Sequence, residues 1–325
     1  MQYMIKNLLS SWYRSLLVGK TEIKEFSTVG IGDVVGEKVY LQTEGLVIDV
    51  TSNQWMLGLE PLTFGIWIED ERYRAALEKK SGYTIYFRRK AAQGSGDVGR
   101  GALAVAELRY FDRIDDEKGT LFLLQISNSH IHHVSGLKAR LLYQKFYRKP
   151  NLSFKKLKAV VTAYSYPRRV RVISFQAGAE YNYIFPMDLL GDIRQSGRYL
   201  LGMRHSNQVL KKIVDVKKIV VSEFPASYKP AIYKLGRNHS ANPPALEELP
   251  FAVIPTRRWG FFVPEWVESY KEVTILRTVD IGSHMLLFGE WAEDQVLKPA
   301  TPRLHHIHFL HFLQQKKRGQ AYPLV

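Results

Sequence analysis

Cysteine is absent from the 325 residues of this chain. That absence excludes disulfide bonds, thiolate metal sites and a cysteine nucleophile, so redox chemistry would depend on a bound cofactor. The sequence also lacks a run of about 20 apolar residues, the length that a membrane-spanning helix needs. Its first residues lack the apolar core of a signal peptide. We therefore expect a cytoplasmic protein without a membrane span.

Acidic residues are in the minority, with 31 aspartates and glutamates against 46 lysines and arginines, and the formal net charge is +15. Such a charge attracts phosphate-bearing ligands, nucleic acid or an anionic membrane surface, and it does not choose among them. The basic residues are scattered along the chain, and no nucleic-acid-binding motif accompanies them. Nucleic acid is therefore not an expected partner.

The length of the chain favours two domains, because a single hydrophobic core rarely extends beyond about 250–300 residues. In residues 1–22, apolar residues recur at helical spacing, which predicts an amphipathic helix packed on the protein itself; a membrane-surface or partner-docking helix is the alternative. Lys149, Pro150 and Asn151 resemble a boundary. We predict one domain over 23–150 and another over 151–325.

Short runs rich in valine, isoleucine, tyrosine, phenylalanine and threonine dominate both halves and predict β-strands. The clearest are Val39–Leu41, Thr84–Phe87, Leu121–Ile126, Val170–Phe175 and Glu272–Leu276. Apart from the N-terminal segment, helices are predicted only at Glu71–Lys80, Gln208–Val214 and Lys229–Leu235. The fold class is therefore mainly β with a few helices.

Two segments of the first half recur in the second half in the same order. A strand around Gly65, a polar turn, a helix and a strand are matched by the same succession around Gly202. A Leu-Arg-x-x-Asp hairpin start at 108–112 is matched at 276–280. This internal repeat predicts two related barrels.

Three segments of the second half, in order, resemble the motifs of the flavin reductase-like family of FMN-binding split barrels. These are Tyr181–Met187, Leu200–Leu210 and Gly282–Glu290, and Val253–Arg258 lies between the last two. The resemblance covers about 130 residues and implies tandem split β-barrels, the second of which binds FMN. The first half is then a divergent copy.

The turn after Arg204 has the properties of a phosphate site even without the resemblance. A turn that opens a helix offers free backbone N–H groups and the positive end of the helix dipole, and Arg204, Ser206, Asn207 and Gln208 add charge and donors. Alternatively, Ser206 or Asn207 only caps the helix. The corresponding turn of the first half, Glu69–Glu71, would repel a phosphate, so one site per chain is expected.

The resemblance implies the remaining site residues. The flavin ring would be lined by Tyr181, Asn182, Tyr183, Phe185, Pro186 and Met187, the phosphate turn would include His205, and His284 would lie near the flavin edge as the candidate catalytic residue. Histidines also cluster at 130–133 and 305–311. No carboxylate accompanies the second cluster in sequence, so we expect no metal site.

The function implied by the resemblance is an FMN-dependent oxidoreductase of the flavin reductase type, with NAD(P)H or a protein as electron donor. Such barrels dimerise, which implies a homodimer or an intramolecular pseudo-dimer. Phe185, Pro186 and Met187 replace hydroxyl residues of the family motif. A non-enzymatic barrel that has lost flavin and binds an anionic polymer or protein through its basic surface is the alternative.

Overall fold

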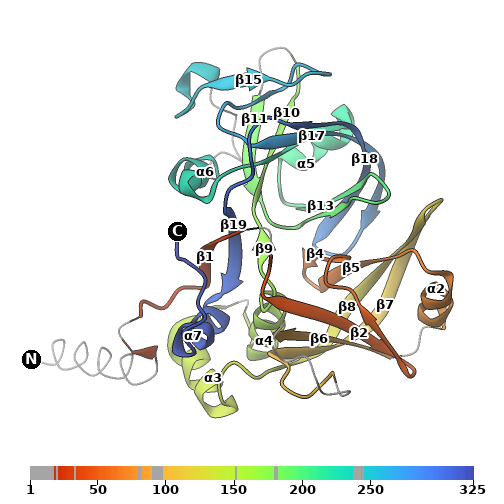
Figure 1. Cartoon of the computed structure of the whole chain (residues 1–325), viewed down its shortest axis with the longest axis vertical. Coiled ribbons are helices and arrows are strands. Elements are labelled where there is room, and N and C mark those ends of the chain that lie inside the picture. The colour runs from red at the N-terminus through yellow and green to blue at the C-terminus, as the bar shows by residue number, and fades with distance from the viewer. Residues whose placement is uncertain are drawn as a thin grey trace, which may run out of the picture.

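The computed structural model describes residues 18–19, 21–32, 34–79, 82–89, 98–150, 152–178, 182–236, 243 and 245–325. Residues 1–17 of the predicted N-terminal helix, and Tyr181 of the predicted flavin site, lie outside these ranges. The protein is mainly β, as the sequence predicts, and most of its strands form two large antiparallel sheets, one above the other in Figure 1.

The first sheet has seven strands in the order β3-β2-β6-β7-β8-β5-β4. Their bounds are β2 Glu37–Thr43, β3 Leu46–Asp49, β4 Gln54–Leu59, β5 Leu62–Ile68, β6 Tyr83–Arg89, β7 Ala104–Asp116 and β8 Gly119–Ile131, and helix α2 (Glu71–Glu78) joins β5 to β6. Alternate residues of β2 are buried in the core of this barrel. Every residue of β5 is buried, because one face covers that core and the other faces the second barrel.

The second sheet also has seven strands, in the order β11-β10-β14-β17-β18-β13-β12. Their bounds are β10 Arg171–Gln176, β11 Asn182–Met187, β12 Leu190–Ile193, β13 Arg198–Arg204, β14 Lys218–Glu223, β17 Ser269–Asp280 and β18 His284–Val296. Helix α5 (Val209–Val216) joins β13 to β14. An insertion between β14 and β17 contains α6 (Lys229–Leu235), two short 3₁₀ turns and the hairpin of β15 (Val253–Pro255) and β16 (Phe262–Pro264).

The two sheets share one strand order: the second, first, fifth, sixth, seventh, fourth and third strands of each unit lie side by side, and a helix follows the fourth. Gly65 and Gly202 both lie in that fourth strand. The Leu-Arg-x-x-Asp segments lie differently, since 108–112 is inside β7 whereas 276–280 ends β17. Only one of the two sequence matches falls at corresponding positions of this shared order, and the internal repeat stays a prediction.

An apolar cluster joins the barrels face to face. Leu57, Trp67, Leu121 and Leu123 are among its residues from the first barrel, and Leu200, Ile281, Leu286 and Phe288 are among those from the second. Strand β4 contacts β12, β13 and β18. A methyl group on Gly202 would overlap the carbonyl oxygen of Leu57, so only glycine allows β13 to approach β4 this closely.

Other contacts cross the predicted boundary at residue 150. A small sheet pairs β1 (Phe26–Ile31) with β19 (Arg303–His308) and β19 with β9 (Arg168–Arg169), so segments near both ends of the chain lie side by side. Helix α4 (Phe154–Ala163), which belongs to the predicted second domain, packs on β7 and β8 of the first barrel. The domain limits remain a prediction about units that fold separately.

The three predicted helices are confirmed as α2, α5 and α6, with ends within two residues of the prediction. The sequence did not predict α3 (Gly136–Leu142) with the π-helical turn Tyr143–Tyr147 after it, α4, or α7 (Phe309–Lys317). In α7, residues 309–313 are all buried, so this helix shows no polar face from which to recognise it. No helix among the described residues is long and apolar enough to cross a membrane.

Candidate functional site

A cavity of about 520 Å³ lies where the first barrel, helix α4 and the end of β13 meet. We call it the junction cavity. Its apolar lining includes Phe26, Leu59, Leu62, Ile126, Ala159 and Val160, and its polar lining includes Ser127, Asn128, Ser129, Lys155, Lys156 and Arg204. The volume lies in the range of small-molecule sites, and the combination of apolar walls with a few polar groups is typical of them.

Charges at the junction cavity are only partly paired. Lys156 lies 3.6 Å from Glu60, and the lining residue Glu25 is paired with Lys149 at 2.9 Å. Arg204 and Lys155 form no ion pair with any described residue. Two cations without counter-ions, next to an apolar wall, suit a ligand that carries an anionic group on an apolar body.

The predicted phosphate turn is only partly directed at this cavity. Arg204 lines it, whereas Ser206 and Gln208 are exposed outside its lining. The side chain of Asn207 accepts a hydrogen bond from the N–H of Val209 at 3.0 Å and so caps α5. His205 lies 3.3 Å from Asp280. The capping interpretation therefore describes Asn207, and Arg204 remains available to a ligand.

The segment predicted to line the flavin ring lies elsewhere. Strand β11 is at the far edge of the second sheet from β13, and Tyr183 and Phe185 are buried in the core of that barrel. The Tyr183 ring stacks on Phe175 with centroids 4.7 Å apart. Asn182 is also buried, and Pro186 and Met187 are half-buried. None of these residues lines the junction cavity, because packing within the barrel takes up their side chains.

His284 lies on β18 directly opposite Arg204 on β13 and is 1% exposed. Its Nδ1 lies 2.8 Å from the hydroxyl of Ser283, while its Nε2 is buried without a hydrogen-bond partner among the described residues. Burial, and then the charges of Arg204 and His205, lower the pKa of His284 to about 4. The imidazole is therefore neutral at pH 7, and it lies beside the cavity rather than in its lining.

The two histidine clusters meet in the fold. The rings of His133 and His311 lie 5.2 Å apart, and His311 Nε2 lies 2.9 Å from a carboxylate oxygen of Glu37. Burial, followed by the charges of the neighbouring histidines, lowers the pKa of His133. Within the described ranges, no group of three or more potential ligands has a geometry that could hold a metal ion. These side chains instead form a buried polar contact between β2 and α7.

The acidic turn of the first half offers no comparable site. Asp70 caps α2 and pairs with Arg72, and Glu69 accepts a hydrogen bond from the Trp67 indole at 3.0 Å. At the β12–β13 turn, which corresponds to the β4–β5 turn of the junction cavity, Arg198 binds Asp116 at 2.7 Å. Side chains of the first barrel thus occupy the corner that repeats the junction cavity.

A second cavity between the barrels, of about 380 Å³, is lined by Arg168, Arg169, Arg171, Arg194, Asp188 and Asp192 among others. Arg169 and Arg171 are paired with Glu223, at 3.3 and 2.5 Å. Arg168 donates to the carbonyl of Ala163 and to Gln54. Because these arginines already pair with protein groups, we interpret them as a structural ion-pair network and not as a binding site.

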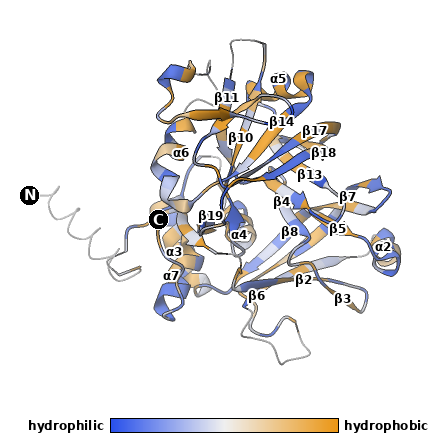
Figure 2. Ribbon diagram, turned by 45° about the horizontal axis from the view of Figure 1, so that its top comes forward, coloured by the Kyte–Doolittle hydropathy of each residue, from blue (hydrophilic) through white to orange (hydrophobic). Residues whose placement is uncertain are grey.

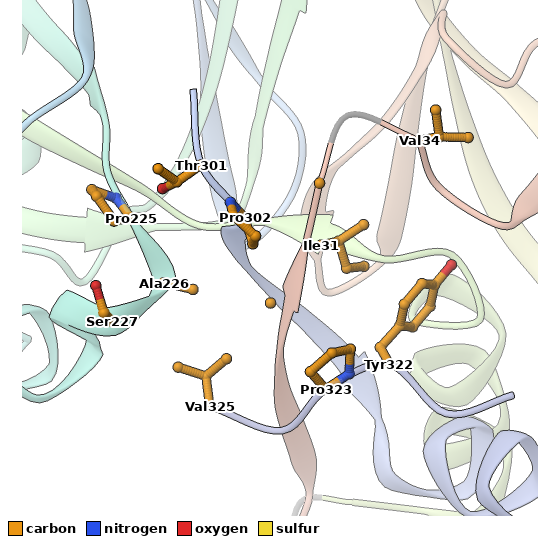
Figure 3. Close-up of a pocket in the computed structure, with 12 residues that line it drawn as sticks. Ile31, Val34, Pro225, Ala226, Ser227, Thr301, Pro302, Tyr322, Pro323 and Val325 are labelled. Carbon is orange, nitrogen blue, oxygen red and sulfur yellow. The ribbon is translucent and has the colours of Figure 1, made fainter. Parts of the chain in front are cut away.

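A third pocket, of about 860 Å³, lies at the surface between β1, the 225–227 turn and the last residues of the chain. Figure 3 shows Ile31, Ala226, Pro302 and Val325 around it, with Tyr322 at one side. Its lining contains no acidic or basic side chain. The pocket therefore offers no cationic side chain to hold a phosphate.

No protein-family model matches the chain, and no curated protein matches its sequence. Solved structures do match. About half of the chain aligns with structures of flavin reductases and FMN-binding proteins.

An NADH:FAD oxidoreductase of Streptomyces globisporus aligns at 14% identity over 48% of this chain and 94% of its own, with a TM-score of 0.42. An FMN-binding protein of Thermus thermophilus aligns at 15% identity over 44% and 82%, with a TM-score of 0.38. The styrene monooxygenase flavin reductase of Pseudomonas putida aligns at 14% identity over 43% and 90%, with a TM-score of 0.36. At this level of similarity, no ligand or site residue transfers from these proteins to this chain.

Sequence reasoning found Arg204 but not the other residues of the junction cavity. Lys155 and Lys156 stand in a basic pair with no motif around them, and Ser127–Ser129 lie inside β8 without any unusual pattern. Helix α4 brings the lysines to β8, and that placement depends on a tertiary contact.

Proposed function

We propose that the chain binds FMN in the junction cavity and is an oxidoreductase of the flavin reductase type. The observation that carries this proposal is the pair of uncompensated cations, Arg204 and Lys155, beside an apolar cavity between the barrels. In this proposal Arg204 and Lys155 hold the phosphate. Leu59, Leu62 and Val160 contact the faces of the ring system, and Ser127–Ser129 offer polar groups to its edge.

Bound FMN would supply the hydride or electron transfer, with NAD(P)H or a protein as donor. The chain would bind and orient the flavin and exclude water from one face of it. His284, neutral at pH 7, would hold the β13–β18 edge beside Arg204 without carrying charge. The resemblance implied that His284 is catalytic; the proposal gives it a positioning role.

Titration of the purified protein with FMN, followed by flavin fluorescence, should reach saturation at one equivalent per chain. The reason is that the corner repeating the junction cavity is filled by the Arg198–Asp116 pair, and the equivalent turn is acidic. Two equivalents would mean that the asymmetry between the barrels does not govern binding. A colourless protein that takes up no FMN would favour the non-enzymatic alternative.

Arg204→Ala should weaken FMN about tenfold and riboflavin hardly at all, because a charge-assisted contact to phosphate is lost and riboflavin has no phosphate. Isothermal titration with both ligands measures the difference. Lys211→Ala is the matched control, since Lys211 is an exposed cation on the nearby helix α5 outside the cavity. Equal losses for FMN and riboflavin would place Arg204 away from the phosphate.

A further inference from the structure

Helices α3, α4 and α7, with the π-helical turn 143–147, pack around one apolar cluster. Leu142, Leu157, Val161, Phe309 and Leu313 belong to this cluster, and so does Val18. Helices α3 and α7 lie side by side in both Figure 1 and Figure 2. We call residues 136–163 and 309–317 the helical lobe. Its apolar cluster is distinct from the two barrel cores, although the other face of α4 packs on the first barrel, and the lobe does not line the surface pocket.

The helical lobe concentrates positive charge. The sequence has no acidic residue from 118 to 179 or from 295 to 325. Within these stretches the helical lobe carries Lys138, Arg140, Lys145, Arg148, Lys149, Lys155, Lys156, Lys158, Lys316 and Lys317. Carboxylates from outside reach two of them: Glu25 pairs with Lys149, and Glu60 pairs with Lys156. The charge of the lobe is thus mostly uncompensated among the described residues.

Some of these cations face one another. Burial, and then the nearby ammonium of Lys317, lower the pKa of Lys138, which places a lysine of α3 against a lysine of α7. The guanidinium of Arg140 and the ammonium of Lys158 lie 6.0 and 5.8 Å from the centre of the same Phe154 ring. Both are in cation–π range of that ring. The repulsion between Lys138 and Lys317 would be relieved by a surface of many anions.

An exposed apolar side chain stands among these charges. Leu137, at the start of α3, is 72% exposed, the second-highest exposure among the large hydrophobic side chains of the described residues. Apolar anchors beside basic residues are what an anionic lipid surface takes, whereas a nucleic acid backbone needs only the charges.

We propose that the helical lobe is a docking surface for an anionic lipid bilayer, with its lysines and arginines against the headgroups and Leu137 entering the interface. This surface is separate from flavin binding. Among the cations of the helical lobe, only Lys155 and Lys156 line the junction cavity, so the experiment leaves them unchanged.

The full-length protein should co-sediment with vesicles of phosphatidylcholine and phosphatidylglycerol at about 0.1 M salt, and not with phosphatidylcholine alone. The variant Arg140→Gln/Lys145→Gln/Lys316→Gln/Lys317→Gln should lower the partition coefficient at least about tenfold, since each cation near an anionic surface contributes. The matched control is Lys79→Gln/Lys211→Gln/Lys234→Gln/Arg277→Gln, which removes the same charge from exposed sites outside the lobe and should retain binding within about twofold.

Leu137→Ser separates a bilayer from a nucleic acid. It should lower vesicle binding several-fold and leave binding to a homopolymer RNA unchanged, because only the bilayer buries the leucine. Unchanged thermal unfolding shows that each variant is folded. The proposal is overturned if the parent ignores anionic vesicles, if the control loses as much as the lobe variant, or if RNA binds the lobe at the same salt while Leu137→Ser leaves vesicle binding intact.

Discussion

Gly202→Ala should lower the free energy of unfolding by about 3 kcal/mol, at the upper end of what overpacking one methyl group costs. The added methyl would overlap the carbonyl oxygen of Leu57, a backbone atom of β4 that cannot rotate away. Strands β4 and β13 would have to separate, and the apolar cluster between the barrels would lose contact. Urea unfolding followed by tryptophan fluorescence measures the loss.

The first barrel supplies a matched control for this substitution. Gly65 occupies the same strand of the first barrel, but a methyl group there would meet the side-chain ends of Leu57 and Leu121, which can move. Gly65→Ala should therefore cost about 1 kcal/mol. Gly136→Ala, where a methyl group meets no atom within 4 Å, should have no cost. Equal losses at Gly65 and Gly202 would contradict the close approach of the two backbones.

Glu223→Gln should destabilise the protein by about 3–5 kcal/mol, the range for breaking a buried ion pair by removing one partner. Glu223 is 8% exposed, and the guanidinium groups of Arg171, Arg169 and Arg303 lie 2.5, 3.3 and 3.7 Å from its oxygens. An amide cannot neutralise three arginines. Glu71→Gln on the exposed face of α2 is the control and should change stability by less than about 0.5 kcal/mol.

The effect of Glu223→Gln should depend on pH. Burial alone would raise the pKa of Glu223, but Arg171, Arg169 and Arg303 outweigh it and lower the pKa from 4.5 to about 2. The unfolded state therefore takes up the proton first, and the stabilisation is present above pH 4.5 and lost as the pH falls toward 2. The difference in unfolding midpoint between parent and variant should shrink across that range. A constant difference would mean that Glu223 acts by packing.

The buried histidines also make the folded state less stable in acid, over a different pH range. Burial is the main reason that the pKa values of His305 and His308 fall to about 3 from an ordinary 6.5. Protonation of the unfolded state therefore removes stability as the pH falls from 6.5. Parent and variant share His308, whose contribution cancels on subtraction, whereas Glu223 raises the pKa of His305, so the variant also changes the contribution of His305.

Local patterns in the sequence were sufficient to predict the strands of the two barrels and the helices α2 and α5. Period-2 burial in β2 and the polar turns before α2 and α5 are visible in the residues themselves. Helix α7 was missed because burial on all sides leaves no amphipathic pattern, and α4 because the chain was expected to begin a new domain there.

The candidate site was harder to predict for a related reason. Arg204 could be found because it precedes a helix, whereas Lys155 acts through a contact between α4 and β8 that no local pattern encodes. Residues of β11 were assigned to the ring by resemblance to a motif, but the apolar run Tyr183–Phe185 also fits a core strand, and the structure buries it there. The order of the motifs was enough to predict the fold, whereas the residues of the site depend on the direction in which each side chain points.

The pairing of β1 with β19 can form only late in the synthesis of the chain. Arg303 follows Ile31 by 272 positions. At a translation rate of about 5–20 residues per second, β19 is therefore synthesised roughly 14–54 seconds after β1. Both barrels can be complete by then, while β1 still lacks its partner strand β19 and cannot yet be held in place over the face of α4 near Phe26. A chaperone that holds exposed strand edges would find its substrate in this interval, and stalling near residue 300 would leave an aggregation-prone nascent chain.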